Sequence, residues 1–443
     1  MRFALSLFDY NILERRPHFP GYPVFCFITK FIHQLIGSVQ YTFSIVGAIA
    51  TFIVLVYSSL TFSIVSNKNI YLLPVLLFIS PLLWIMSNRY MSDLLGLSLL
   101  MVVVYYLLSY SISNSARQIF MAFFVLGTLA GVRISFLPFF IPLTFFVLAK
   151  SSFKIASKSI LSFVLGVLIW IIPLIIITGL DDLYYISQIH IDGHFNKWGG
   201  SILTSNFSFQ FRLTKLIESV WADGMGGFWP GRNPITFLVS IGWLFSILFS
   251  FRSQKLIKNK MALPLKLIIL SIITYFIWIF LFQNIVYKPR HIIPFIPFIT
   301  MVSAAGFDKA IGVNKKFSPL MYVFTLSIFA TTTFLNIQHK DPSAISQVKS
   351  YIVDDKSNKK VFCSSNLINN YVKKHNNSES IVFINIHDDA DLKNHYNRGF
   401  DIFSTKNLNR LEMDLVDESI FYHNPYVNRL WSTMRIYKYR KKD

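Results

Sequence analysis

The stretch RRPHFPGYP, residues 15–23, stands immediately ahead of a long series of apolar segments. Its three prolines and one glycine fix a bent, non-helical path, because each proline locks its own φ and restrains the residue before it. Such a path is costly inside lipid unless protein buries it or it lines a wet cavity. We therefore expect residues 15–23 to form part of a site at a membrane surface. The alternative is a proline-rich loop leading into an apolar helix.

The composition outside this stretch indicates a membrane protein. Of 443 residues, 53% are hydrophobic and only 14% are charged, and the mean hydropathy is +0.49. A soluble domain carries about 25% charged residues. The net charge of +20 could suggest nucleic acid, but the basic residues are spread through short loops between apolar segments. That distribution orients a protein in a membrane, so the membrane is an expected partner and nucleic acid is not.

Apolar segments long enough to cross a bilayer need about 20 residues. The candidate spans are Val39–Ser66, Ile70–Met86, Asp93–Tyr110, Ile160–Thr178, Ile235–Phe251, Leu265–Gln283, His291–Phe307 and Ser318–Asn336. The apolar stretch between residues 119 and 149 contains Arg133, which would be costly inside a single span. We expect two short helices that turn at Arg133. Residues 21–37 carry Lys30 and His33 and are expected to lie in the membrane interface.

These spans predict which loops share a side of the membrane. With the first loop outside, the basic residues between spans fall inside, as the positive-inside rule requires. They are Lys68, Arg117, Lys150, Lys154, Lys158, Arg252, Lys255, Lys258, Lys260, Lys315 and Lys316. Residues 1–38, 87–93, 180–234 and 285–290, together with Arg133, fall outside. Every motif that could bind a substrate or act in catalysis is thus expected on one side of a transmembrane domain formed by residues 1–338.

Residues 339–443 have a different character, being polar with mixed charge. Strands are expected at Lys360–Ser364 and Ser380–Ile386 and helices at Leu367–His375 and Asp389–Arg398, with further strands at Phe400–Ser404 and Met434–Tyr439. A glycine-rich loop follows neither of the first two strands, so a nucleotide site is not expected. The predicted fold class is an α-helical polytopic membrane protein with a small C-terminal α/β soluble domain. As a separate prediction, that domain is expected on the extracytoplasmic side.

Several basic residues of the outer loops could bind an anion. The motif KPRH, residues 288–291, opens a span, and Arg290 offers the planar fork that suits a phosphate. The alternative for this motif is an interfacial basic anchor. Arg133, at an unusual membrane depth, suits either an anionic head group or an ion pair with a buried acid.

Two outer aspartates could act in catalysis. Asp93 begins a span shortly after Arg89, and it serves either as a helix cap or as a carboxylate at the rim of an outer cavity. Asp9 lies in a loop that can fold back over the same cavity.

His190, Asp192 and His194 alternate along the long outer loop and would share one face if the segment were extended. A divalent cation could then use them as ligands. Without a further ligand at short spacing, a loop that contacts substrate is the preferred interpretation. Nearby Trp198 offers an aromatic face that suits a sugar ring or an interfacial belt.

The first loop also resembles a known family. Phe3-Ala4-Leu5, then Asp9, then PHFPGYP at residues 17–23 are similar to the first outer loop of GT-C glycosyltransferases of the protein-mannosyltransferase and lipid A aminoarabinose-transferase type. Residues 87–93, residues 131–133 and the motif KPRH with Pro294 resemble later segments of that family. The resemblance covers roughly residues 1–310. It implies a sugar donor linked to a polyprenyl phosphate, an outer lipid, glycan or protein acceptor, and inversion at the anomeric carbon.

Roles for individual residues follow from this resemblance and from the chemistry of each side chain. A cation can stabilise the leaving phosphate while a carboxylate takes the acceptor's proton. The expected catalytic acids are Asp9 and Asp93. The expected phosphate-binding residues are Arg290, Lys288, His291, Arg133 and Arg89. The expected substrate-loop residues are His18, Tyr22, His194 and Trp198.

One feature departs from the family pattern. In these relatives the first-loop catalytic aspartate precedes the Phe-Ala-Leu stretch, behind an initial transmembrane helix, whereas here Met1 and Arg2 occupy that place. We expect that the chain begins late and lacks this helix and this acid, with Asp9 left to substitute. The competing functions are an inactive relative that binds lipid-linked sugar and a lipid-linked glycan transporter. The expected location is a bacterial inner membrane, with the site facing the periplasm or exterior.

Overall fold

The computed structural model describes residues 2–66, 70–251, 259–374 and 381–441. The chain divides into two compact units, Met1–Phe334 and Leu335–Asp443. The first unit is built of helices, and the second carries a five-stranded sheet. The predicted fold class is therefore confirmed. Lys68, Arg252, Lys255 and Lys258, expected in inner loops, and the expected element ends His375 and Ser380 lie outside the described residues.

The long helices of the first unit match most of the predicted spans. They are α3 (Val39–Ser66), α6 (Asp93–Ser113), α7 (Ala116–Arg133), α9 (Phe153–Thr178), α12 (Ile235–Phe251), α13 (Asn259–Phe282), α14 (Ile296–Val313) and α15 (Ser318–Gln338). Among the described residues, seven segments are long and apolar enough to cross a membrane. In α9 the most apolar window has a mean hydropathy of 3.0, yet only 11% of it is buried. So much exposed apolar surface requires lipid around it.

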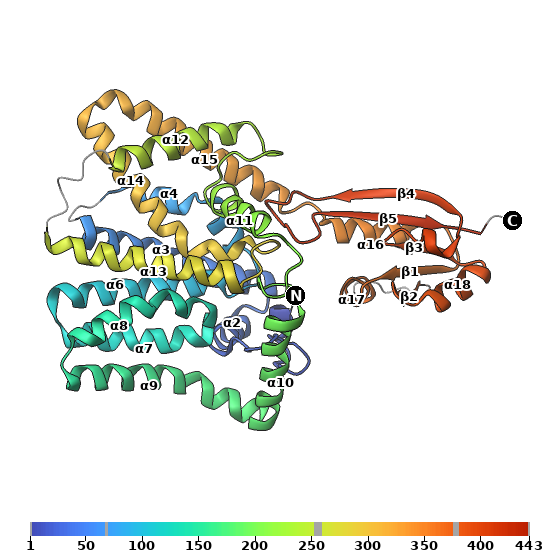
Figure 1. Cartoon of the computed structure of the whole chain (residues 1–443), viewed down its shortest axis with the longest axis horizontal. Helices are drawn as coiled ribbons and strands as arrows, with labels where there is room; N and C mark the ends of the chain where they lie inside the picture. The colour runs from blue at the N-terminus through green and yellow to red at the C-terminus, as the bar shows by residue number, and fades with distance from the viewer. Residues whose placement is uncertain (1, 67–69, 252–258, 375–380, 442–443) are drawn as a thin grey trace. The chain divides into compact units, whose positions relative to one another are not determined.

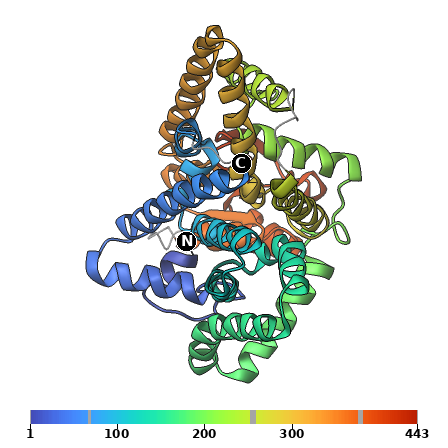
Figure 2. The same cartoon turned by 90° about the vertical axis from the view of Figure 1, so that its left-hand side faces the viewer.

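The stretch that contains Arg133 folds as a hairpin. Helix α7 ends at Arg133, and the 3₁₀ helix η1 (Ile134–Phe140) leads into α8 (Ile141–Lys150). The hydroxyl groups of Tyr110, near the end of α6, and Ser151, just after α8, lie 2.8 Å apart. The chain has therefore returned to the end of the helices from which α7 started, and the predicted turn at Arg133 is confirmed. Helix α7 packs against α6 and α9 (Figures 1 and 2).

The prediction of one continuous span at residues 70–86 is wrong. Two short helices, α4 (Leu72–Phe78) and α5 (Pro81–Ser87), replace it. Pro81 disfavours a helical conformation at the residue before it, and Ser80 is accordingly extended, with φ −63° and ψ 126°. Thr332 donates a hydrogen bond of 2.6 Å to the carbonyl of Ile79, which satisfies an acceptor that the break leaves free.

Shorter helices connect the spans of the first unit. They are α1 (Arg2–Leu5), α2 (Pro23–Ile36), α10 (Leu180–Asp192), α11 (Phe209–Glu218), the π-helices η2 (Gly193–Lys197) and η3 (Ser219–Gly224), and the 3₁₀ helices η5 (Pro289–Phe295) and η6 (Lys315–Phe317). Residues 189–194 are helical rather than extended, because α10 and η2 cover them, so the shared face considered for His190, Asp192 and His194 does not form. Asp181 and Asp182 in the first turn of α10 favour a helix start there.

The second unit has helices on both faces of a mixed sheet (Figure 1). Its strands are β1 (Lys360–Ser364), β2 (Ile381–Asn385), β3 (Asp401–Ser404), β4 (Leu415–Tyr422) and β5 (Thr433–Tyr439), in the order β2-β1-β3-β5-β4. Strand β1 pairs in parallel with β2 and β3, whereas β5 runs antiparallel to β3 and β4. Along β1, Phe362 packs with α16 (Ala344–Asp354) and α17 (Asn366–Lys374), while Val361 packs with α18 (Asp389–Asn397). A short 3₁₀ helix, η7 (Asn409–Leu411), precedes β4.

Most elements of the second unit were predicted from the sequence. Strands β1, β2, β3 and β5 and helices α17 and α18 lie within a few residues of the expected positions. Helix α16 and strand β4 were not expected.

Candidate active site

Asp93 is the centre of a buried charged cluster at one end of the first unit's helices. It is the first residue of α6, and its side chain is 1% exposed. Arg133 Nη2 lies 2.8 Å from Asp93 Oδ1, and Arg290 Nε lies 3.6 Å from the same oxygen. Within the described part of the chain, neither oxygen of Asp93 accepts an aligned hydrogen bond. The carboxylate therefore forms ion pairs with two arginines without an aligned hydrogen bond.

Three elements meet to form this arrangement: the start of α6, the end of α7 and the start of η5. Gly96, one turn into α6, permits the approach, because a Cβ at that position would lie 2.8 Å from the Cβ of Arg133. Arg290 follows Pro289 at the start of η5. Its Nη1 lies 3.3 Å from the sulfur of Met91, two residues before the start of α6. Residues far apart in the sequence are thus fixed around one carboxylate.

Further basic side chains surround this centre. Burial lowers the pKa of Arg89 to about 10, and the carboxylates of Asp93 and Asp223 oppose that shift. Burial, followed by the charges of Arg290 and Arg133, lowers the pKa of Lys288 to about 8. The cations of this neighbourhood therefore outnumber the two carboxylates, and an excess of positive charge in a sheltered site favours an anionic ligand.

His291 completes the group that the sequence assigned to phosphate binding. It is buried, and it lies close enough to Arg133, Arg290 and Lys288 to feel their charge. Tyr275 fixes its backbone by donating a 3.1 Å hydrogen bond to the His291 carbonyl. The Nδ1 atom of His291 is buried without a hydrogen-bond partner among the residues described. The structure thus brings all five predicted phosphate-binding residues into one neighbourhood.

The first loop follows the bent path expected from its prolines. The peptide bonds before Pro17 and Pro20 are cis, and Tyr10 donates a 2.9 Å hydrogen bond to the Gly21 carbonyl. Gly21 has φ +88°, and a Cβ there would lie 2.5 Å from side-chain atoms of Ile12 and Tyr10. This turn directs Tyr22 toward the cluster, where the Arg133 guanidinium lies 6.0 Å from its ring centroid.

The predicted substrate-loop residues also lie together. Tyr22 Oη is 3.2 Å from His18 Nε2, and the His18 ring faces the His190 ring at a centroid distance of 6.4 Å. His190 in turn lies 6.4 Å from the parallel ring of His194 and 4.9 Å from that of Trp198. His190 therefore links the first loop to residues 190–198 in one aromatic row, an arrangement that suits a sugar ring.

The histidines of this row are neutral near pH 7. Burial, with added repulsion from Arg2 and Arg133, lowers the pKa of His18 to about 3. Burial and His194 lower the pKa of His190 to about 4. A neutral imidazole at His18 can accept a hydrogen bond from the Tyr22 hydroxyl.

Asp9 forms its ion pair with Arg16 and not with the arginines that contact Asp93. Its side chain is 54% exposed, and its Oδ2 lies 2.9 Å from Arg16 Nη1. Arg16 also pairs with Glu14. Asp9 thus belongs to a surface ion-pair group at the edge of the first loop.

The alternating residues His190, Asp192 and His194 do not converge as an extended segment would have placed them. In a helix, residues four apart share a face, so the two histidines stay together while Asp192 points elsewhere. Asp192 pairs with Lys197 at 2.6 Å and accepts a 3.0 Å hydrogen bond from Asn196. Among the described residues, no group of three or more His, Cys, Asp or Glu side chains is placed to hold a metal ion.

Sequence reasoning missed Asp223 as a member of the cluster. It is buried in the π-helix η3, which packs against η5, and its charge acts on Arg89. Asp223 opens the run DGMGG at residues 223–227, and nothing in that local pattern predicts its burial or its neighbours.

Sequence reasoning also missed Arg212, which joins two segments that lead to the site residues. It is 1% exposed, and its guanidinium donates to the carbonyls of Phe280, Gln283 and Gly200 at 2.6, 2.6 and 3.2 Å. It therefore ties the loop that follows Trp198 to the end of α13, from which the chain runs to Lys288.

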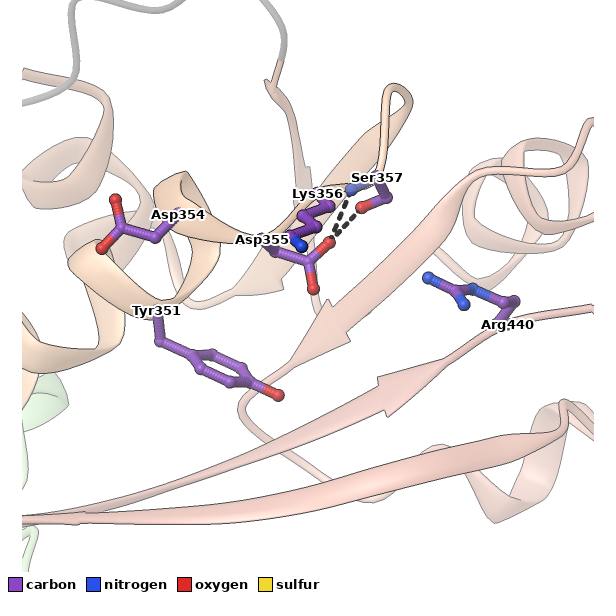
Figure 3. Close-up of a pocket in the computed structure, with 6 residues that line it drawn as sticks. All are labelled: Tyr351, Asp354, Asp355, Lys356, Ser357 and Arg440. Atoms are coloured by element: carbon purple, nitrogen blue, oxygen red, sulfur yellow. Dashed lines mark hydrogen bonds between the residues drawn. The ribbon is translucent and has the colours of Figure 1, made fainter.

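A separate hollow of about 620 Å³ lies in the second unit (Figure 3). Its lining residues are Tyr351, Asp354, Asp355, Lys356, Ser357 and Arg440. Asp355 accepts a 2.9 Å hydrogen bond from the Ser357 amide and pairs with Lys438 at 2.5 Å, while Arg440 makes a two-pronged contact with Asp401 at 2.9 and 2.6 Å. These groups already have partners, so the hollow is a weaker ligand site than the Asp93 cluster.

Comparisons with known proteins show the fold. No family model matches the sequence, and no curated protein matches it. Two crystal structures of ArnT from Cupriavidus metallidurans resemble it at 10% identity. The structure bound to undecaprenyl phosphate has a TM-score of 0.52 over 94% of this chain and 87% of that chain. The apo structure has a TM-score of 0.51 over 98% and 92%. The overall fold is therefore similar to that of ArnT, as the motifs led us to expect.

Proposed function

We propose that this chain is a glycosyltransferase that moves a sugar from a polyprenyl-phosphate donor to an acceptor outside the membrane. The observation that carries the proposal is the buried Asp93 among Arg133, Arg290, Arg89 and Lys288, beside an aromatic row. The undecaprenyl phosphate in one ArnT structure, which shares this fold, supports the donor class.

The excess cations suit the leaving group of this reaction. A polyprenyl-phosphate sugar is a phosphodiester with one negative charge, and cleavage of its sugar bond adds a second charge to the phosphate. Arg290 and Arg133 can bind phosphate oxygens through their planar forks, and Lys288 adds a point charge. Preorganised cations at the place where charge develops lower the barrier to reaction.

Asp93 is the proposed general base. An acceptor hydroxyl or amine attacks the anomeric carbon, and the bond from that carbon to the phosphate oxygen breaks with its electron pair on the oxygen. The acceptor's proton passes to Asp93. Attack from the face opposite the phosphate inverts the anomeric carbon. Asp9, the other proposed acid, would have to leave Arg16 to take part.

The proposed location places the cluster on the periplasmic or exterior face of a bacterial inner membrane. The opposite end of the helices carries Lys150, next to the Tyr110–Ser151 contact, and Lys309, which donates to the Ser250 carbonyl. Basic residues favour the cytoplasmic side, so the Asp93 end is assigned to the outside. The second unit is proposed to lie outside as well.

A transfer assay with purified chain in proteoliposomes tests this function. A panel of labelled polyprenyl-phosphate sugars is offered with lipid, glycan and peptide acceptors. We expect transfer from at least one donor, lost in Asp93→Ala. Donor binding without transfer, in protein shown to be folded, would identify the inactive lipid-linked-sugar binder. Movement of intact donor across the bilayer would identify the transporter.

A further inference from the structure

We infer that Arg133 and Arg290 occupy Asp93 when the site holds no donor, and that the donor phosphate releases the carboxylate by taking these arginines. This inference rests on the proposed function and adds an order to it. Both guanidinium groups meet the same oxygen, Asp93 Oδ1, at 2.8 and 3.6 Å. Cations held against one oxygen compete with an incoming proton for the same carboxylate.

The contacts also leave hydrogen bonds unmade. Within the described residues, Arg133 Nε, Arg290 Nε and both oxygens of Asp93 are buried without an aligned partner. Buried donors and acceptors in this condition are costly. A phosphate offers several acceptor oxygens with a geometry that matches the guanidinium fork. The two arginines can therefore satisfy their donors better on a phosphate than on Asp93.

The exchange couples the two substrates. Once the arginines turn to the phosphate, Asp93 Oδ1 loses its contacts with both of them. The carboxylate is relieved of these two cations when a donor is in place, so the donor binds productively before the acceptor. Asp93 and the phosphate compete for the same cations, and removing Asp93 should strengthen phosphate binding.

The test measures the affinity of the full chain for undecaprenyl phosphate in nanodiscs. Asp93→Asn keeps the shape of the side chain and removes its charge. We expect it to bind the lipid phosphate roughly tenfold more tightly, which corresponds to ~1.4 kcal/mol. Weaker or unchanged binding would overturn the inference.

The matched control is Asp223→Asn, which makes the same change in net charge at a carboxylate that acts on Arg89. We expect a tightening of less than about threefold there, because Arg133 and Arg290 stay on Asp93. Equal tightening in both variants would show a general charge effect and would overturn the inference.

The binding assay needs no sugar transfer, so it separates this inference from the proposed function. Loss of transfer in Asp93→Asn with unchanged affinity supports the transferase and overturns the exchange. If Asp93→Asn fails to fold, a structure of the wild-type chain with undecaprenyl phosphate decides. We expect Arg133 and Arg290 on the phosphate and away from Asp93. An Arg133–Asp93 distance still near 2.8 Å would overturn the exchange.

Discussion

The charged cluster around Asp93 and the charged network of the second unit use buried charge in different ways. Lys438 lies between Asp355 and Asp401 at 2.5 and 3.3 Å, and Arg440 makes a two-pronged contact with Asp401. Around Asp93 the ion pairs are not aligned as hydrogen bonds, and cations exceed carboxylates. The network of the second unit stabilises its sheet, whereas the cluster around Asp93 is the one that we propose receives a ligand.

The largest expected contrast comes from replacing one aspartate in each region. Asp93→Asn should lower the rate of sugar transfer by about 10³-fold, because it removes the proposed base. Asp355→Asn makes the same chemical change in the second unit and should leave the rate within about twofold, since the partners of Asp355 are Lys438 and Ser357 and not the residues of the Asp93 cluster. Initial rates at saturating donor measure both. Similar losses in the two variants would erase the distinction between the regions.

A smaller contrast is expected for the arginines. Arg290→Ala should lower kcat/KM for the donor about 10²-fold, because a cation at the developing phosphate charge is lost. Arg440→Ala in the second unit serves as the control and should leave donor kinetics unchanged. Rates measured across a series of donor concentrations test this. Unchanged donor kinetics in Arg290→Ala would remove its proposed role.

The charge excess of the Asp93 cluster should make lipid-phosphate binding sensitive to pH. Lys288 has a pKa of about 8, so its positive charge is lost as the pH rises through that value. We expect affinity for undecaprenyl phosphate to fall up to about tenfold between pH 7 and pH 9, because bound phosphate favours the charged lysine. Titration of binding against pH measures this fall. The Lys288→Arg variant should keep its affinity across the range, and an equal fall in that variant would assign the effect elsewhere.

The smallest effect is expected on the stability of the second unit in acid. Burial alone would raise the pKa of Asp355, but Lys438 and Ser357 hold it at about 2. This stabilisation is present above the ordinary pKa of about 4 and is lost as the pH falls toward 2. We expect a loss of ~1 kcal/mol, seen as faster amide exchange in β1 and β5 at pH 3 than at pH 5 after correction for intrinsic rates. Asp355→Asn should show little of this pH dependence.

The sequence was sufficient for elements with a strong local pattern. Strand β1 has the expected ends, because a short apolar run between polar residues suits a buried strand. Strand β4 was missed because Asp417, Glu418 and Ser419 interrupt its apolar residues, and its pairing with β5 decides its conformation. At residues 70–86, average hydropathy concealed the effect of Pro81 on Ser80.

The sequence was sufficient to name residues of the candidate site but not to say which atoms they contact. The motifs named Asp93, Arg133 and Arg290 separately, because each combines an unusual position with a suitable side chain. Their convergence on one carboxylate oxygen depends on how α6, α7 and η5 pack, which local patterns do not specify. Asp192 shows the converse, since the face it could share with His190 and His194 required an extended backbone, whereas α10 is helical.

The clamp made by Arg212 has a consequence for reading mutational screens of this chain. One side chain holds three carbonyl groups from two segments, one following the aromatic row and one leading to the cationic cluster. A substitution there would loosen both halves of the site while touching neither lipid nor sugar. A screen scored by product alone would rank Arg212 beside the arginines proposed to bind phosphate, and only a parallel measurement of melting temperature would show that its role is structural.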